Sequence, residues 1–129
     1  MPRSKKKAII SGKAPKAVGP YSQAVVFGDL VFVSGQIPLS AESGLLLKGD
    51  ICESLRIVLK NTDEILKTAG SSLENILKVT VYITDISLFS ELNDEYAKHF
   101  REPYPAREVI QVSSLPKGAN VEISVIAHL

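Results

Sequence analysis

The side chains that could do chemistry in this chain are few, and Arg107 is the most informative of them. It follows Pro105-Ala106 and opens a run of strand-forming residues. The proline fixes its own φ and favours an extended conformation in the residue before it, so the arginine enters its strand from a stiff approach. A guanidinium held in this way suits a planar anion such as a carboxylate, which it can bind through two parallel hydrogen bonds. The alternative is an ordinary arginine at a strand end that forms a surface salt bridge.

The usual nucleophiles and metal ligands are scarce. The chain has one cysteine, Cys52, and two histidines. Their positions do not form the cluster that a protein metal site requires. We therefore expect no metal site, and any chemistry must rest on other groups.

Three further polar residues are candidates, each with an alternative interpretation. Asn93 lies in an apolar helical stripe, where an unpaired amide would cost about 1–3 kcal/mol, so it either serves a site or bonds to a neighbouring loop backbone. Glu122 lies on the face of the last expected strand opposite its apolar residues, as a site acid or as a solvated side chain. Tyr21 follows Gly19-Pro20 and is either a loop anchor or a ligand contact.

Size and charge exclude several classes of protein. The 129 residues make one domain, and a net charge of +1 provides no global electrostatic case for nucleic-acid binding. The chain has no apolar run long enough to span a membrane. The lone cysteine excludes an intrachain disulfide and favours a reducing compartment, so we expect a cytoplasmic protein. Residues 1–13 are interpreted as a basic tail that leads into the first strand, with mitochondrial targeting as the alternative.

The first half of the chain predicts a hairpin and a helix. Two apolar runs flank Gly28-Asp29, which predicts a tight turn of type I′ or II′. Gly35 in the second run indicates a bulge or the close approach of another group. Asp50 is a natural N-cap and Gly70 a C-terminal cap, and the residues between them carry an apolar stripe.

The second half predicts strands at 78–84, 107–112 and 121–127 and a helix at 87–100. Phe89, Asn93, Tyr96 and Phe100 lie on one stripe of that helix. Parallel strand–helix–strand crossovers are right-handed, which puts both helices on one face of the sheet. The other face is left uncovered although several of its positions are apolar, so we predict a homo-oligomer.

The spacing of Arg107 and Glu122 also indicates an oligomer. We expect 107–112 and 121–127 to pair as an antiparallel hairpin, which separates the two residues by 4–5 positions, or roughly 15 Å. One small ligand cannot span that distance. If both residues belong to one site, they must come from different subunits.

Five short motifs occur together along the chain. In order they are Gly19-Pro20-Tyr21-Ser22-Gln23-Ala24, Ser34-Gly35-Gln36-Ile37-Pro38, Asn93 with Tyr96 and Phe100, Pro105-Ala106-Arg107, and Leu115-Pro116-Lys117-Gly118 leading to Glu122. With this set the chain closely resembles the RidA family (YjgF/YER057c/UK114), the reactive-intermediate deaminases. The resemblance covers residues 14–129.

The resemblance implies an α+β, chorismate-mutase-like two-layer sandwich, with a mixed β-sheet that carries two helices on one face. It also implies a homotrimer with clefts between subunits, and hydrolysis of 2-imino or enamine acids to 2-oxo acids and ammonia without a metal or organic cofactor. By the same resemblance Arg107 binds the substrate carboxylate, and Glu122 positions or activates water. Tyr21, Ser34 and Asn93 line or support the cleft, and Gly35 and Ile37 accompany its wall.

The chain departs from the family pattern beside the arginine. Val109 stands where studied deaminases often carry cysteine, and Glu108 stands where many relatives have a small hydroxyl residue. In a regular strand Glu108 points away from the face of Arg107, whereas in a bulged strand its charge would compete with a substrate carboxylate. Two alternatives stay open: an RNA-acting translation inhibitor or endoribonuclease, for which Lys5, Lys6 and Lys7 are the main support, and a non-catalytic metabolite-binding protein.

Overall fold

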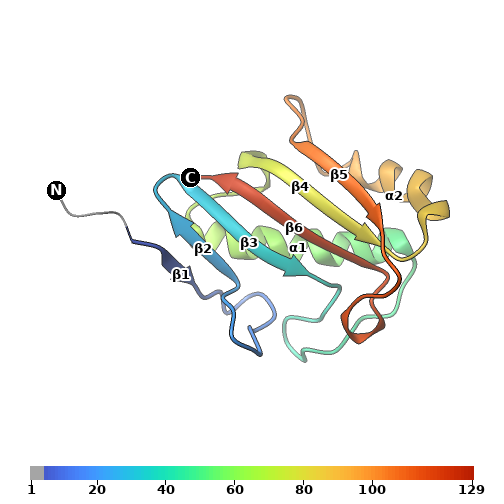
Figure 1. The fold of residues 1–129 in the computed structure, drawn as a ribbon, viewed down its shortest axis with the longest axis horizontal. Helices are drawn as coiled ribbons and strands as arrows, with labels where there is room; N and C mark the ends of the chain where they lie inside the picture. The colour runs from blue at the N-terminus through green and yellow to red at the C-terminus, as the bar shows by residue number, and fades with distance from the viewer. Residues whose placement is uncertain (1–4) are drawn as a thin grey trace.

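Alternating apolar residues build a six-stranded mixed sheet in the computed structural model, which describes residues 5–129 (Figure 1). The strands are β1 Lys7–Ile9, β2 Ala24–Phe27, β3 Leu30–Gln36, β4 Ile76–Ile83, β5 Ala106–Gln111 and β6 Val121–His128. Their order across the sheet is β1-β2-β3-β6-β4-β5, and only the β4–β5 pair is parallel. Residues 1–4 of the expected tail lie outside the described residues, and residues 7–9 of that tail form β1.

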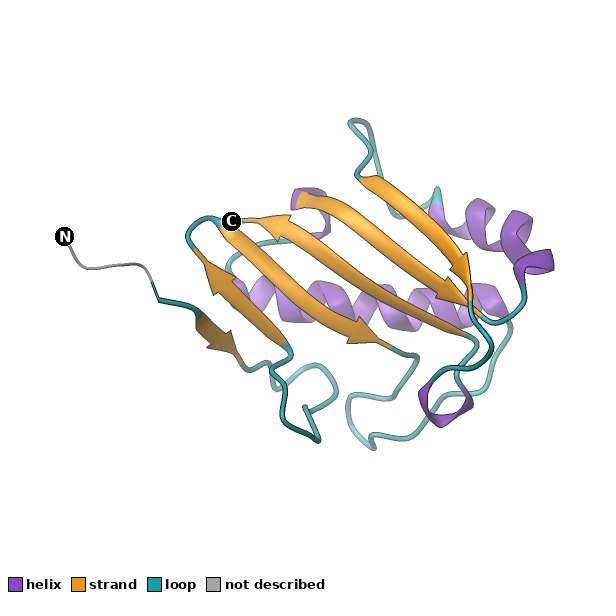
Figure 2. Cartoon of the chain, in the orientation of Figure 1, coloured by secondary structure: helices purple, strands orange, loops and turns teal. Residues whose placement is uncertain are grey.

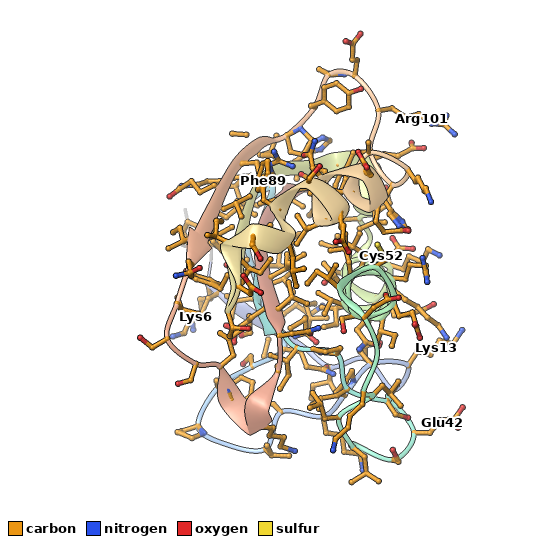
Figure 3. All side chains as sticks on the ribbon, turned by 90° about the vertical axis from the view of Figure 1, so that its right-hand side faces the viewer. Lys6, Lys13, Glu42, Cys52, Phe89 and Arg101 are labelled. Atoms are coloured by element: carbon orange, nitrogen blue, oxygen red, sulfur yellow. The ribbon has the colours of Figure 1, made fainter. Side chains whose placement is uncertain are left out.

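Two helices cover one face of this sheet, as the edge-on view of Figure 3 illustrates. They are α1 Ile51–Ala69 and α2 Phe89–Tyr96 (Figure 2), and short 3-10 turns occur at Leu73–Asn75, Ile86–Leu88 and Pro116–Gly118. Apolar side chains of both helices and of the strands form one core. The predicted two-layer α+β fold with both helices on one face is therefore confirmed. Within residues 5–129, neither helix is long and apolar enough to cross a membrane.

The local signals of the first half are also confirmed. Phe27 pairs with Leu30 across the two-residue turn, and Gly28 has a φ of 60°, as a type II′ turn requires at its first central position. Asp50 caps α1, because its Oδ1 accepts a hydrogen bond from the Glu53 backbone N–H at 2.8 Å. Gly70 ends the helix with a left-handed φ of 91°.

The second helix is shorter than the predicted range 87–100. Asp85 Oδ1 accepts from the Ser87 backbone N–H at 3.0 Å, and this contact accompanies a 3-10 turn before α2 begins. After Tyr96 the backbone N–H of Lys98 bonds to the carbonyl three residues earlier, which tightens the chain out of the α-helix. Phe100, the last residue of the expected apolar stripe, is nevertheless buried, although it lies beyond the end of the helix.

The strand order corrects the predicted pairing of 107–112 with 121–127. β4 lies between β5 and β6: it pairs with β5 in parallel and with β6 in antiparallel. β6 therefore has neighbours on both sides, and its residues Val121, Ile123, Val125 and Ala127 are buried. β5 lies at the edge of the sheet, and none of its residues is fully buried.

An ion cluster around a buried carboxylate ties the two helices together. Glu95 on α2 is only 3% exposed. Its Oε1 bonds to Arg56 Nη1 of α1 at 2.7 Å, and its Oε2 lies 2.8 Å from His99 Nε2. Burial raises the pKa of this carboxyl, but the hydrogen bond with His99 and the charges of Lys98 and Arg56 outweigh burial, and the pKa lies below its ordinary value. The cluster fixes α2 against α1 and so fixes the side chains that α2 presents to β5.

Candidate functional site

A cavity of about 770 Å³ opens where β3 ends and β6 begins. Its walls come from the loop before β2, the loop after β3, and the 3-10 turn Pro116–Gly118 that precedes β6. Five of the predicted site residues line it: Tyr21, Ser34, Gly35, Ile37 and Glu122. The fold thus collects residues that are a hundred positions apart in the chain.

Glu122 is the acid that β6 contributes to this cavity, and Glu42 of the loop after β3 also lines it. Glu122 lies on the helix-free face, because it alternates along β6 with the buried residues Val121 and Ile123. Among the described residues it takes part in no ion pair. Burial raises the pKa of its carboxyl above the ordinary value for glutamate. Glu122 is therefore partly buried at the cavity and not fully exposed to solvent.

Gly35 allows this carboxyl to lie against the backbone of β3. The register of β3 against β6 shifts between Val33 and Gln36, which is the bulge that the glycine indicated. A Cβ at position 35 would overlap Glu122 Oε2 and lie 2.8 Å from its Cδ atom. Both sequence interpretations of Gly35, a bulge and a close approach, are therefore confirmed.

Ser34 and Tyr21 join the cavity wall to the loop before β2. Ser34 Oγ donates to the Ser22 carbonyl oxygen at 2.6 Å, which ties β3 to this loop. The Tyr21 hydroxyl accepts from the Val18 backbone N–H at 3.4 Å, while 51% of the residue stays exposed at the cavity. Tyr21 thus anchors its loop and also lines the cavity.

Arg107 and Asn93 form a second cluster, at the edge strand β5. Arg107 Nη1 donates to Asn93 Oδ1 at 2.8 Å, so the Asn93 amide is bonded to this guanidinium rather than to a loop backbone. The Arg107 Cζ atom lies 4.6 Å from the ring centroid of Tyr96 and 5.6 Å from that of Phe89. Within the described chain no carboxylate lies within ion-pair distance of Arg107, so the surface salt bridge considered above is absent.

Glu108 does not compete for this guanidinium. β5 runs alongside β4 without a register shift, so Glu108 and Arg107 point to opposite faces. Glu108 Oε1 instead pairs with Lys78 Nζ at 2.8 Å on the neighbouring strand. The Glu108 carboxylate therefore does not lie on the face of Arg107, where it would compete with a substrate carboxylate.

The two clusters lie on opposite faces of the sheet. Arg107 is opposite Val79 in the β4–β5 register, and Glu122 is opposite Tyr82 in the β4–β6 register. Val79 and Tyr82 are three positions apart on one strand, so their side chains, and those of their partners, point to opposite faces. Three strand residues and two strand spacings also separate the clusters by about 14 Å in the plane of the sheet. Arg107 and Glu122 therefore do not meet within one chain. The sequence argument predicted this separation, although the hairpin that it assumed was wrong.

Some residues of these clusters escaped the sequence analysis. Gln23 is buried and organises the loop below the cavity, because its Nε2 donates to the Ser11 and Pro15 carbonyl oxygens at 3.2 and 2.7 Å. Phe89 and Tyr96 contact Arg107, although only their common stripe was noticed. The aromatic pair that flanks Asn93 at helical spacing was the available signal in the sequence, whereas the burial of Gln23 is seen only in the structure. In residues 5–129 no three histidine, cysteine, aspartate or glutamate side chains lie close enough to hold a metal ion.

The chain is similar to known proteins in sequence and in fold. The family model described as Endoribonuclease L-PSP matches residues 11–129. The chain is similar to the 2-iminobutanoate/2-iminopropanoate deaminase of Bos taurus, with 45% identity over 95% of this chain and 89% of the relative. It is similar to a solved structure of a protein of unknown function of the conserved Rid family from Yersinia pestis, with 46% identity, a TM-score of 0.94, and coverage of 97% of this chain and 100% of that one. It is also similar to the solved structure of Escherichia coli TdcF with bound serine, with 39% identity, a TM-score of 0.87, and coverage of 95% and 98%.

Proposed function

The chain belongs to the RidA family, and on this premise we propose that it hydrolyses reactive 2-imino and enamine acids, such as 2-iminobutanoate and 2-iminopropanoate, to 2-oxo acids and ammonia. Relatives at this level of identity are named imine deaminases. The proposal concerns the activity of this chain, its substrate class and the residues that perform the reaction.

The single observation that carries the proposal is the state of Glu122. Its half-buried carboxyl, with a pKa raised by burial, lies at a cavity of about 770 Å³ that five candidate residues line. A carboxyl whose pKa is raised holds a proton more readily than an exposed glutamate, which suits general acid–base work. The reaction needs such a group and needs no strong nucleophile, because a protonated imine is already electrophilic.

The reaction divides into two steps with Glu122 as the proton carrier. The ionised carboxylate takes a proton from water as the water oxygen bonds to the imine carbon, and the C=N π pair moves to nitrogen. The protonated carboxyl then returns that proton to the amine. The C–N bond breaks, ammonia leaves with the bonding pair, and the remaining hydroxyl loses its proton to solvent to form the 2-oxo acid. Tyr21 and Ser34 border the reacting group, and Arg107 holds the substrate carboxylate in place.

We propose that each site is shared by two subunits of a homotrimer. Arg107 and Glu122 lie on opposite faces of one sheet, so a substrate that contacts both needs a second copy of the chain. The helix-free face offers apolar surface for that contact. Four of its large side chains are more than a third exposed: Phe27, Leu30, Phe32 and Ile110. Light scattering at micromolar concentration tests the assembly, and a monomeric mass would contradict it.

Turnover is tested by generating 2-iminobutanoate in situ and following its loss. We expect wild type to accelerate the loss and Arg107→Ala to reduce kcat/KM by about 10- to 150-fold, which corresponds to a charged hydrogen bond worth about 1.5–3 kcal/mol. Arg107→Lys is the matched control, because it keeps the charge and loses the planar fork. No acceleration by wild type, or an unchanged rate in Arg107→Ala, would contradict the proposal.

Subunit complementation tests the shared site directly. Arg107→Ala and Glu122→Gln should each be nearly inactive alone. When the two are refolded together in equal amounts, about one quarter of the sites in a cyclic trimer combine an intact arginine with an intact glutamate of the neighbour. Recovery of about that share of wild-type turnover supports a shared site, whereas no recovery would place both residues in one subunit's site.

Action on RNA is a second candidate, because the matching family model is described as an endoribonuclease. Of the lysines expected to support it, Lys5 and Lys6 are exposed and Lys7 belongs to β1. Filter binding to single-stranded RNA across a salt series tests this, because phosphate contacts produce a steep loss of affinity with salt. Binding of a 2-oxo acid without turnover of the imine would instead favour a metabolite-binding protein.

A further inference from the structure

We infer that Phe89 and Tyr96 are positioning residues of the shared site, because their rings hold the Arg107 guanidinium in one orientation. In that orientation Asn93 bonds to one nitrogen, and the other N–H donors remain available for a substrate carboxylate. The inference rests on the proposed function, in which Arg107 binds that carboxylate. It adds two residues that act through the arginine rather than on the substrate.

The first step is the geometry around the guanidinium. The Arg107 Cζ atom lies 4.6 Å from the ring centroid of Tyr96 and 5.6 Å from that of Phe89, both within the range of a cation–π contact. Arg107 Nη1 also donates to Asn93 Oδ1 at 2.8 Å. Two ring contacts and one directed hydrogen bond restrict both the plane of the guanidinium and its rotation within that plane.

The second step is the origin of all three contacts in one helix. Phe89, Asn93 and Tyr96 follow at intervals of four and three residues on α2, so they lie on one face of the helix. The Phe100 ring stacks on Tyr96, with centroids 4.3 Å apart and an interplanar angle of 22°. The ion cluster around Glu95 fixes the same helix to α1. The helix that contacts Arg107 is thus held in place by the stack of Phe100 on Tyr96 and by the ion pair of Glu95 with Arg56.

The third step is a count of donors. An arginine side chain has five N–H donors and no acceptor. Among the described residues, Asn93 is the one side-chain partner of Arg107. A planar carboxylate needs two parallel donors, which the remaining N–H groups can provide. Pre-orientation matters because a free arginine loses rotamer entropy when it binds, and the rings have already restricted it.

The fourth step concerns which part of Tyr96 acts. Its hydroxyl is buried and has no hydrogen-bond partner in residues 5–129. Burial raises the pKa of Tyr96 to about 12, so the phenol stays neutral at physiological pH. The face of the ring, rather than the hydroxyl, therefore makes the contact with Arg107. Tyr96→Phe keeps that face and Tyr96→Leu removes it, which provides a matched pair of variants.

The experiment measures KM and kcat for in situ 2-iminobutanoate in Phe89→Leu, Tyr96→Leu and Tyr96→Phe. We expect Phe89→Leu and Tyr96→Leu to raise KM roughly 3- to 30-fold, the range of a partly desolvated cation–π contact, with kcat changed far less. Tyr96→Phe should match wild type. Phe100→Leu is the graded control, because Phe100 stacks on Tyr96 and makes no cation–π contact with Arg107 itself, so it should raise KM less than Tyr96→Leu does.

The double variant with Arg107→Ala separates positioning from packing. If the rings act through the arginine, Phe89→Leu should add nothing to the KM of Arg107→Ala, whereas a purely structural role would add its full effect. Phe89 is 37% exposed, so this variant should fold even if Tyr96→Leu does not. Additive effects, or a Tyr96→Phe variant as impaired as Tyr96→Leu, would overturn the inference.

Binding of 2-oxobutanoate, measured by calorimetry, keeps this test independent of turnover. If wild type binds the 2-oxo acid and Phe89→Leu weakens that binding, the inference stands even when no imine is hydrolysed, and only the proposed reaction fails. If Phe89→Leu binds the 2-oxo acid as tightly as wild type, the inference fails whatever the turnover.

Discussion

Adding one methyl group at Gly35 should displace the Glu122 carboxyl without disturbing the backbone. Gly35 is not among the residues with positive φ, so an alanine can adopt its conformation. The new Cβ would overlap Glu122 Oε2 and lie 2.8 Å from Cδ and 3.1 Å from Cγ. These atoms belong to the flexible end of a side chain, so Glu122 can rotate away rather than force the strands apart.

The magnitude follows from that rotation. A side chain forced off its rotamer costs about 0.5–1.5 kcal/mol, and overpacking of a well-packed site costs about 1–3 kcal/mol. We therefore expect Gly35→Ala to lower the free energy of unfolding by about 1–2 kcal/mol. Turnover should fall much further, by about 10²- to 10⁴-fold, because a general acid–base group has left its position.

Chemical denaturation and imine turnover, measured on the same variants, test this reasoning. In a Glu122→Ala background the clash is absent, so Gly35→Ala should then cost almost no stability. Gly12→Ala is the control, because no atom lies near a Cβ at that position and its φ is not positive. An equal loss of stability in both backgrounds, or an active Gly35→Ala variant, would refute the argument.

Three further predictions concern charge and capping. The pKa of Glu95 is lowered in the folded state, so its stabilisation is present above the unfolded pKa of about 4.3 and is lost as the pH falls through the folded value. Glu95→Gln should lower the free energy of unfolding by about 1–2 kcal/mol at pH 7, because its partners Arg56 and Lys98 are 49% and 69% exposed and water can solvate them. The variant should also flatten the fall of stability at acid pH, and a fall as steep as that of wild type would contradict this. The pKa of Glu122 is raised in the folded state, so ionisation of this carboxyl lowers stability as the pH rises. Glu122→Gln should therefore be at least as stable as wild type at pH 7 but far less active. A less stable variant would argue against burial as the cause of the raised pKa. Asp50→Ala should lower stability by about 1 kcal/mol through loss of the α1 cap, and Asp50→Asn should retain most of it in thermal unfolding.

Features that depend on neighbours in the chain could be read from the sequence. The turn at Gly28, the cap at Asp50 and the left-handed end at Gly70 each involve contacts within a few residues, so residue type alone predicts them. The alternation of apolar residues likewise placed Glu122 on the face opposite the core. The sequence also predicted that Arg107 and Glu122 are far apart within one chain, although that prediction assumed an incorrect strand pairing.

The tertiary structure decided which strands are neighbours and therefore where the two clusters lie. Periodicity determines which face of a strand is apolar, but it does not state which strand pairs with which, because pairing energies are similar for many apolar strands. The insertion of β6 between β3 and β4 put Glu122 beside Gly35, and the edge position of β5 put Arg107 against the aromatic stripe of α2. The sequence by itself therefore determined the candidate residues and the faces of their elements, and only the global packing of the sheet determined which of them meet.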